Sequence, residues 1–295
     1  MPLADAQKLL AAARAGGYAV PAFNVANLEF VLAVVGAAED EGAPVFVAVS
    51  EGAFKYAGDV LATVARELIA AAPVPIALHL DHGSSLASAR HALGLGFNSV
   101  MLDGSKLPYE ENVALAAAAV KEFGPAGIAV EAELGHVGGG DDPSVYTEPA
   151  KAAAFVAAAG VGSLAVAVGT SHGAYKFKGD PTIDLARLEA IAAATPAPLV
   201  LHGASAVYPD VVAALAAAGG EPGDARGLPD DLLAAAIKRG IAKVNVDTDL
   251  RLAFAAALRG YFRDHPAETD PKKYLAAGRD AVRALARRKI RACRP

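Results

Sequence analysis

The chain repeats one unit: a short apolar run rich in β-branched residues ends in polar residues, and an Ala- and Leu-rich helical segment follows. The runs are almost continuously apolar rather than alternating, which is typical of parallel strands covered by helices. The unit occurs eight times. The eight runs are Tyr18–Asn24, Val45–Ser50, Pro75–His82, Ser99–Asp103, Ile128–Leu134, Leu164–His172, Pro198–His202 and Ala242–Asp247.

Eight strand–helix units within 295 residues predict an α/β fold, a (β/α)8 TIM barrel, as a single domain over residues 1–295. An N-terminal helix ends at Gly16-Gly17, and a C-terminal helical extension closes the chain. An open doubly wound sheet is the alternative, but it needs a glycine-rich turn after the first strand, where this chain has Asn24-Val25-Ala26-Asn27. The expected helices are Leu28–Glu41, Leu61–Ala71, Leu86–Leu95, Glu110–Phe123, Pro149–Ala158, Leu185–Ala193, Val211–Ala218 with Asp230–Arg239, Leu250–Phe262 and Pro271–Ile290.

The composition excludes several classes of protein. A hydrophobic fraction of 54% with a net charge of only −5 is not that of a disordered chain, and without a basic stripe we expect no nucleic-acid partner. The one cysteine, Cys293, rules out a disulfide framework and indicates a reducing, cytoplasmic location. The weakly charged stretch Ala152–Tyr175 is broken at Gly160 and Gly162, so we interpret it as helix, turn and buried strand rather than a membrane span.

Histidines gather where the predicted strands end. His79, His82, His172 and His202 all lie at predicted strand ends, where barrels of this kind place their chemistry. His82, His172 and His202 are each followed by glycine, which lets the backbone and a ligand approach closely. Three imidazoles with an open fourth position are the ligand set of a catalytic zinc site. The alternative is a set of unrelated, hydrogen-bonded histidines.

Carboxylates accompany these histidines. Asp81, next to His82, is suited to orient an imidazole or to act as a general acid–base; otherwise it is a helix-capping residue. Glu131 and Glu133 are two apart and therefore share one face of a strand. Paired acids inside a barrel serve a metal, a cation or a proton transfer, or else they are buried against a lysine such as Lys243.

Two further segments suggest substrate contacts. The segment 136–142 has three glycines followed by two acids, the pattern of a loop that carries a carboxylate over a substrate, or of an ordinary surface loop. The loops after the last two strands form the usual phosphate site of this fold. Backbone N–H groups, hydroxyls or a bound cation would hold the phosphate there, because acids fit poorly. The residues concerned are Gly203, Ser205, Asp247 and Thr248, with Lys176 as an added charge or as a plain surface lysine.

The motifs together resemble the class II, metal-dependent fructose-1,6-bisphosphate aldolases. The resemblance runs from Pro21–Asn24 to Asp270–Leu275, although tagatose-bisphosphate aldolases share the same motifs. The motifs are Leu80-Asp81-His82-Gly83, Glu131-Ala132-Glu133-Leu134-Gly135, Gly169-Thr170-Ser171-His172-Gly173-Ala174-Tyr175-Lys176, Leu201-His202-Gly203-Ala204-Ser205 and Lys243-Val244-Asn245-Val246-Asp247-Thr248-Asp249.

The resemblance implies a metal centre. His82, His172 and His202 match the ligands of a catalytic zinc, which is cobalt in some members, and Glu133 matches a ligand of an alternate inner position. Zinc then acts as a Lewis acid on the ketone of dihydroxyacetone phosphate, and an enediolate attacks glyceraldehyde 3-phosphate. Cleavage of fructose 1,6-bisphosphate is the reverse of these steps.

The resemblance also assigns roles to other residues. Asp81 matches the residue that protonates the aldehyde oxygen, and Asn245 the one that orients the ketose-derived intermediate. The proton-abstracting loop residue, usually Glu in the family, is Asp141 here, and Asp142 is the alternative. The matching substrate and phosphate residues, which include a site for a monovalent cation (Na⁺, K⁺ or NH₄⁺), are Asn24, Ser50, Gly173, Gly203, Ser205, Asp247 and Thr248.

Family members often take an arginine from a neighbouring subunit for the second phosphate, which implies a homodimer or homotetramer. The candidates in the last helical segment are Arg279, Arg283, Arg287 and Arg288.

Three other functions compete. A lysine Schiff-base aldolase would use Lys243, but it leaves the histidines without a role. A metal-dependent amidohydrolase would need His-x-His at the end of the first strand, which here ends in Phe23-Asn24. A non-catalytic sugar-phosphate-binding barrel would be favoured by the loss of a ligand, and no ligand position is lost.

Overall fold

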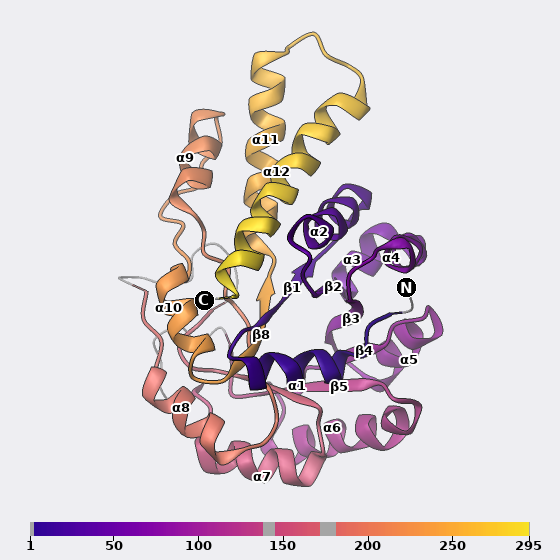
Figure 1. The fold of residues 1–295 in the computed structure, drawn as a ribbon, viewed down its shortest axis with the longest axis vertical. Helices are drawn as coiled ribbons and strands as arrows, with labels where there is room; N and C mark the ends of the chain where they lie inside the picture. Colours follow the sequence, from indigo (N-terminus) through magenta and orange to yellow (C-terminus); the bar gives the residue numbers. More distant parts are fainter. Residues whose placement is uncertain (1–2, 138–144, 172–180, 295) are drawn as a thin grey trace.

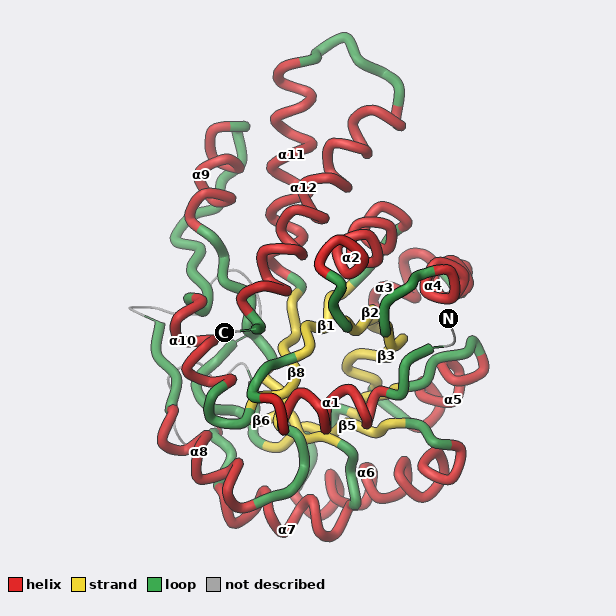
Figure 2. Tube along the Cα trace, viewed as in Figure 1, coloured by secondary structure: helices red, strands yellow, loops and turns green. Residues whose placement is uncertain are grey.

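The computed structural model describes residues 3–137, 145–171 and 181–294. In these residues, eight parallel strands close into a barrel in sequence order, with β1 paired to β8, and helices surround the barrel (Figures 1 and 2). This architecture confirms the predicted (β/α)8 barrel. The strands are β1 (Val20–Asn24), β2 (Val45–Ser50), β3 (Ile76–Gly83), β4 (Ser99–Leu102), β5 (Ala129–Leu134), β6 (Ser163–Val166), β7 (Leu199–Leu201) and β8 (Ile241–Val246).

The helices follow the strands in the expected order. Two of them, α9 and α10, lie between β7 and β8 on either side of the glycine- and proline-rich segment 219–229. The helices are α1 (Ala6–Gly16), α2 (Leu28–Glu41), α3 (Glu51–Ala57), α4 (Val60–Ala71), α5 (Leu86–Gly94), α6 (Tyr109–Phe123), the 3-10 turn η1 (Gly124–Ala126), α7 (Pro149–Ala159), α8 (Leu185–Ala194), α9 (Pro209–Ala217), α10 (Asp230–Ile237), α11 (Thr248–Asp264) and α12 (Pro271–Ala292). None of the described helices is long and apolar enough to cross a membrane.

Helix α1 closes the amino-terminal end of the barrel, across which it runs in Figure 1. The helix begins where the Asp5 carboxylate accepts a hydrogen bond from the backbone N–H of Lys8. Its buried Leu10 packs with inward-facing strand residues, among them Phe46 and Ala77, in an apolar cluster separate from the larger core between strands and helices. Because this end is sealed with apolar side chains, solvent and ligands reach the barrel from the opposite end.

The C-terminal extension is held to the barrel by packing and by ion pairs. Helix α12 packs against α2 and α11, and the two long helices α11 and α12 extend beyond the barrel (Figure 1). Arg283 pairs with Asp40 and Arg287 with Glu41, both at the end of α2. The arginines of this helix that were candidates for reaching a neighbouring subunit, Arg279 and Arg288 included, all pair with carboxylates of their own chain.

Two elements differ from the sequence prediction. Strand β6 ends at Val166, and the prediction that it reaches His172 is wrong. The N–H and C=O of Ala167 are both taken by Thr147, so they cannot continue the pairing with β7. The short helix α3 was not predicted; it begins directly after β2, where the Ser50 hydroxyl accepts a hydrogen bond from the N–H of Ala53.

The apolar seal at the amino-terminal end generates a stability prediction. Leu10→Ala leaves a cavity under α1 and is expected to cost about 2–5 kcal/mol, a melting temperature lower by several degrees in a scanning calorimeter. Leu28→Ala is the matched control, because Leu28 is 48% exposed at the start of α2. Equal melting temperatures for the two variants would contradict the assigned role of α1.

Candidate active site

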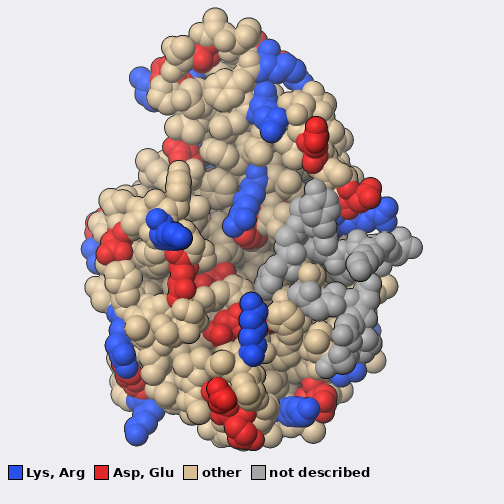
Figure 3. All heavy atoms as spheres, turned by 180° about the vertical axis from the view of Figure 1, so that it is seen from behind, with Lys and Arg blue, Asp and Glu red and all other residues tan. Residues whose placement is uncertain are grey.

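The open end of the barrel carries a polar cleft of about 500 Å³. Seen from the side opposite to α1, the molecule is hollowed near its centre, with acidic side chains in the hollow and basic ones beside it (Figure 3). The carboxyl ends of the strands supply the lining, as in other barrels of this type. The predicted site residues that line it are Asn24, Ser50, Asp81, His82, Glu133, His202, Gly203, Ser205, Asn245, Asp247 and Thr248.

The end of β3 places two consecutive side chains in this cleft. Neighbouring residues on a regular strand point to opposite faces, which would separate Asp81 from His82. Here the pairing of β3 with β4 shifts register between Leu80 and Gly83, and His82 has a φ of 49°, in the left-handed region. An irregularity of this kind re-aims side chains beside functional sites. Both Asp81 and His82 therefore line the cleft.

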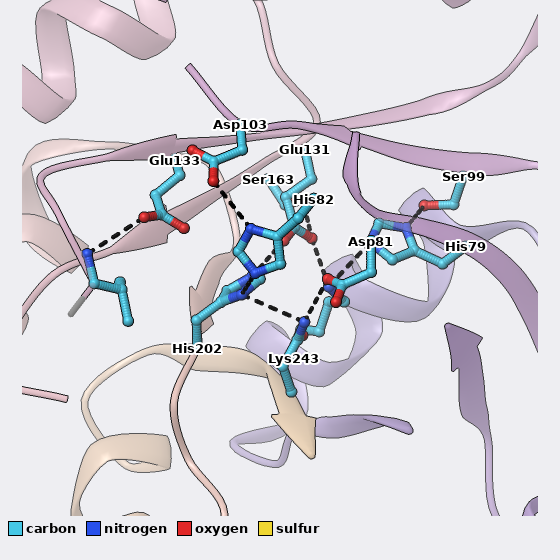
Figure 4. A network of polar contacts seen from close by, with 12 residues as sticks. His79, Asp81, His82, Ser99, Asp103, Glu131, Glu133, Ser163, His202 and Lys243 are labelled. Atoms are coloured by element: carbon cyan, nitrogen blue, oxygen red, sulfur yellow. Dashed lines mark hydrogen bonds and ion pairs between the residues drawn. The ribbon is translucent and has the colours of Figure 1, made fainter. Parts of the chain in front are cut away.

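His82 and His202 both line the cleft and lie next to each other (Figure 4). Nε2 of His82 lies 3.0 Å from Nδ1 of His202, and the two rings meet edge to face. Ligand atoms of Asp81, His82 and His202 all lie within 4.8 Å of one another, and so do those of His82, Asp103 and Glu133. Two ring nitrogens facing each other beside carboxylates are donors that a divalent metal fits.

Glu133 supports the same interpretation. One of its oxygens accepts a hydrogen bond from the N–H of Val137, whereas the buried Oε2 has no hydrogen-bond partner in the part of the chain that the structure describes. A buried carboxylate oxygen without a partner is costly unless something positive binds there. Burial and the nearby charge of Asp103 raise the pKa of Glu133 to about 8. A metal bound beside Glu133 would remove this penalty.

Asp103 also lines the cleft, although it is not among the predicted site residues. It follows β4, and its Oδ2 lies 3.1 Å from Nδ1 of His82. Burial opposes protonation of His82, but the hydrogen bond with Asp103 and the charges of Asp81 and Glu133 outweigh it and raise the pKa of His82 to about 9. Burial raises the pKa of Asp103, but the hydrogen bonds that Asp103 accepts, chiefly the one with His82, outweigh this effect and hold the pKa well below its usual range. The only sequence signal for Asp103 is its position directly after a strand, which is common for acids.

Asp81 is held by two amides. Asn24 donates a hydrogen bond to one of its oxygens over 2.7 Å, and Asn245 donates to the other over 2.8 Å. Burial raises the pKa of Asp81, but the charges of His82 and His202 and the bond from Asn24 prevail and lower it. The arrangement keeps an oriented carboxylate beside the histidines.

Glu131 lies deeper than Glu133 and contacts different groups. Its side chain pairs with Nζ of Lys243 at 2.8 Å and with Nε2 of His202 at 2.9 Å (Figure 4). His79 is not at the mouth, so its assignment to a strand end is wrong. It lies one inward-facing position below Asp81 on β3 and contacts Ser99 and Lys243 inside the barrel.

The opposite wall of the cleft is formed after β7 and β8. Gly203 has a φ of +64°, and a Cβ there would come within 2.5 Å of the carbonyl oxygen of Ser171, so only glycine fits. The N–H of Asp247 points to the hydroxyl of Ser205, and α11 begins at Thr248. The amino-terminal end of α11 therefore lies at the cleft, which Thr248 lines.

A lysine and an arginine lie in the lining that the structure describes, and neither is among the predicted site residues. Lys106 follows β4, and Arg251 on α11 pairs with Asp247 at 2.7 Å. Helical spacing gave a signal for Arg251, which stands four residues after Asp247. Five candidate site residues lie outside the described residues: His172, Gly173, Lys176, Asp141 and its alternative Asp142.

A histidine–carboxylate cluster at the open end of a barrel is typical of metal-dependent barrel enzymes. Comparison with known proteins specifies the class. The family model described as "Fructose-bisphosphate aldolase class-II" matches residues 4–295, so the chain belongs to the class II fructose-bisphosphate aldolases, a family of metal-dependent carbon–carbon lyases. This finding confirms the resemblance noted in the sequence.

Similarity to known proteins covers almost the whole chain. The chain is 47% identical to a fructose-bisphosphate aldolase of Thermus caldophilus, over 96% of this chain and 95% of that protein. It is 42% identical to a fructose-bisphosphate aldolase of Giardia intestinalis, over 99% of this chain and 93% of that protein. Among solved structures, the YdjI aldolase of Escherichia coli K12 superposes with a TM-score of 0.83 at 32% identity, covering 99% of this chain and 97% of that one.

The raised pKa of His82 predicts proton release on metal binding. Only a neutral imidazole binds a metal, so at pH 8 a group with a pKa of about 9 must first lose its proton. We expect zinc binding to metal-free protein at pH 8 to release about one proton, as counted by calorimetry in buffers of different protonation enthalpy.

Asp103→Asn is the matched variant. It replaces the carboxylate that raises the pKa of His82 with a neutral amide, which supports the imidazolium less, so clearly less proton release is expected at the same pH. The same release from both proteins would contradict the assigned electrostatics.

Proposed function

We propose that this chain catalyses the reversible cleavage of fructose 1,6-bisphosphate into dihydroxyacetone phosphate and glyceraldehyde 3-phosphate. One observation carries the proposal: the donors of Asp81, His82 and His202 converge at the open end of the barrel. Membership of the class II family supports the substrate class. A homodimeric or homotetrameric state and a cytoplasmic location are part of the proposal.

The metal site is proposed to hold zinc, or cobalt, between His82, His202 and His172, with Glu133 as the ligand of an alternate inner position. The facing ring nitrogens and the unpartnered Glu133 oxygen support this assignment. A bound metal would act as a Lewis acid that polarises the ketone carbonyl of the sugar.

Asp81 is proposed to move the proton of the C4 hydroxyl. In cleavage, the ionised carboxylate takes this proton as the C3–C4 bond breaks, and the bonding electrons pass toward the C2 carbonyl to give an enediolate. In condensation, Asp81 returns the proton to the aldehyde oxygen. The lowered pKa of Asp81 suits the cleavage direction, because the group must begin as a carboxylate. Asn245 orients both Asp81 and the enediolate.

The proton at C3 needs a second acid–base group. We propose Asp141, with Asp142 as the alternative, to protonate the enediolate in cleavage and to remove the proton in condensation. The three glycines before these acids support a loop that reaches the substrate. The whole cycle then balances, since one proton leaves the C4 hydroxyl and one arrives at C3.

The phosphates are proposed to bind on two sides of the cleft. The wall of Gly203, Ser205, Asp247 and Thr248 offers helix N–H groups and hydroxyls to one phosphate, and a monovalent cation would offset the carboxylate of Asp247. Gly173 and Lys176 join this site in the proposal. Asn24 and Ser50 contact the far side of the substrate, and Lys106 and Arg251 are the described cations available to the second phosphate.

The central test is cleavage of fructose 1,6-bisphosphate, coupled to detection of triose phosphate. Activity is expected to disappear with EDTA and to return with zinc or cobalt. Tagatose 1,6-bisphosphate, which differs at C4, is assayed in parallel to distinguish the related activity. Full activity in protein shown by metal analysis to be metal-free would overturn the proposed zinc mechanism.

Asp81→Asn tests the proton transfer. The amide keeps the size of the side chain but cannot accept the C4 proton, so kcat is expected to fall about 10²–10⁴-fold with metal content unchanged. His136→Asn is the control, because His136 lines the same cleft and has no assigned role. A kcat within a few-fold of the wild type for Asp81→Asn would remove Asp81 from the mechanism.

A further inference from the structure

A chain of buried polar groups runs beneath the histidines at the open end of the barrel (Figure 4). Nε2 of His202 lies 2.9 Å from Oε1 of Glu131, and Oε2 of Glu131 lies 2.8 Å from Nζ of Lys243. At least 98% of each of these three side chains is buried. Such groups are kept in a barrel interior only when their hydrogen bonds are satisfied, so each contact constrains its neighbour.

The Lys243 end of this hydrogen-bonded series is fixed, because Lys243 can only donate hydrogen bonds. An ammonium group only donates, so Nε2 of His79, 3.3 Å from Nζ, accepts, and Nδ1–H of His79 donates to the hydroxyl of Ser99 over 2.8 Å. Nζ donates likewise to Oε2 of Glu131. The orientation of the carboxylate is therefore set from below.

At the other end of the series, Glu131 selects the tautomer of His202. A carboxylate only accepts hydrogen bonds, so Nε2 of His202 must carry a hydrogen to bond with Glu131. In the neutral ring, the lone pair is then on Nδ1, the atom that faces Nε2 of His82 at 3.0 Å. A carboxylate or carbonyl behind a metal-binding histidine orients the ring in this way.

We propose that Glu131 and Lys243 are positioning residues: together they hold His202 as the Nε2–H tautomer and direct its Nδ1 lone pair into the metal site. The inference rests on the proposed function, in which His202 binds the metal. It also gives Lys243 a role other than imine formation, because the amine is fully buried, lies below His202 and donates to two acceptors.

Glu131→Gln separates positioning from packing. The donors of Lys243 require the oxygen of the new amide, so its NH₂ group must point to Nε2 of His202. That nitrogen becomes an acceptor, and the hydrogen of the neutral ring moves to Nδ1. Zinc affinity, measured by chelator competition, is expected to fall about 10–100-fold.

The double variant Glu131→Gln/Lys243→Met tests the cause. Without the ammonium group, the amide is free to turn its oxygen toward His202, so part of the zinc affinity should return although two polar contacts are gone. Met101→Leu is the matched control, because Met101 is a buried neighbour of Glu131 on the adjacent strand β4. Its affinity should stay within about twofold of the wild type.

Long-range ¹H–¹⁵N spectra of the histidine rings in metal-free protein provide a readout independent of catalysis. The wild type should show His202 with hydrogen on Nε2, and Glu131→Gln should show it on Nδ1. A wild type with hydrogen on Nδ1, or Glu131→Gln within twofold of wild-type zinc affinity, would overturn the inference. Absence of aldolase activity in the wild type would refute the proposed function alone, since the spectra report the tautomer whether or not sugar is cleaved.

Discussion

The pairing of β1 with β8 is the constraint on which the site depends. These strands are far apart in the sequence, and their parallel hydrogen bonds close the sheet so that all eight carboxyl ends surround one opening. Asn24 from β1 and Asn245 from β8 then reach the same carboxylate, Asp81 of β3. Helix α1 seals the other end with apolar side chains, which leaves one entrance.

Polarity increases along the interior of the barrel from the sealed end to the open end. Apolar side chains fill the first level, the Lys243–Glu131 pair and His79 the second, and His82 and His202 the third. A buried ion pair is weak evidence of added stability, because desolvation offsets the attraction of the charges. Its position directly below His202 indicates that it serves the site above rather than the stability of the barrel.

The sequence predicted the barrel because parallel strands covered by helices leave continuous apolar runs, and it predicted His82 and His202 because strand ends carry the site. It did not predict the register shift that turns both Asp81 and His82 inward, since a bulge depends on pairing with β4. The early end of β6 depends likewise on Thr147, which is distant in the sequence. Asp103 was missed because a single acid after a strand is common, and only its distance from His82 distinguishes it.

The most direct test of this account is anomalous diffraction at the zinc edge from crystals of the zinc-loaded protein. The account predicts an anomalous peak for a zinc ion that lies about 2.0–2.1 Å from both Nε2 of His82 and Nδ1 of His202. Asp81 should lie beside the ion, and Glu131 behind His202. A fully occupied zinc ion that contacts neither histidine, with the two rings still joined to each other, would contradict it.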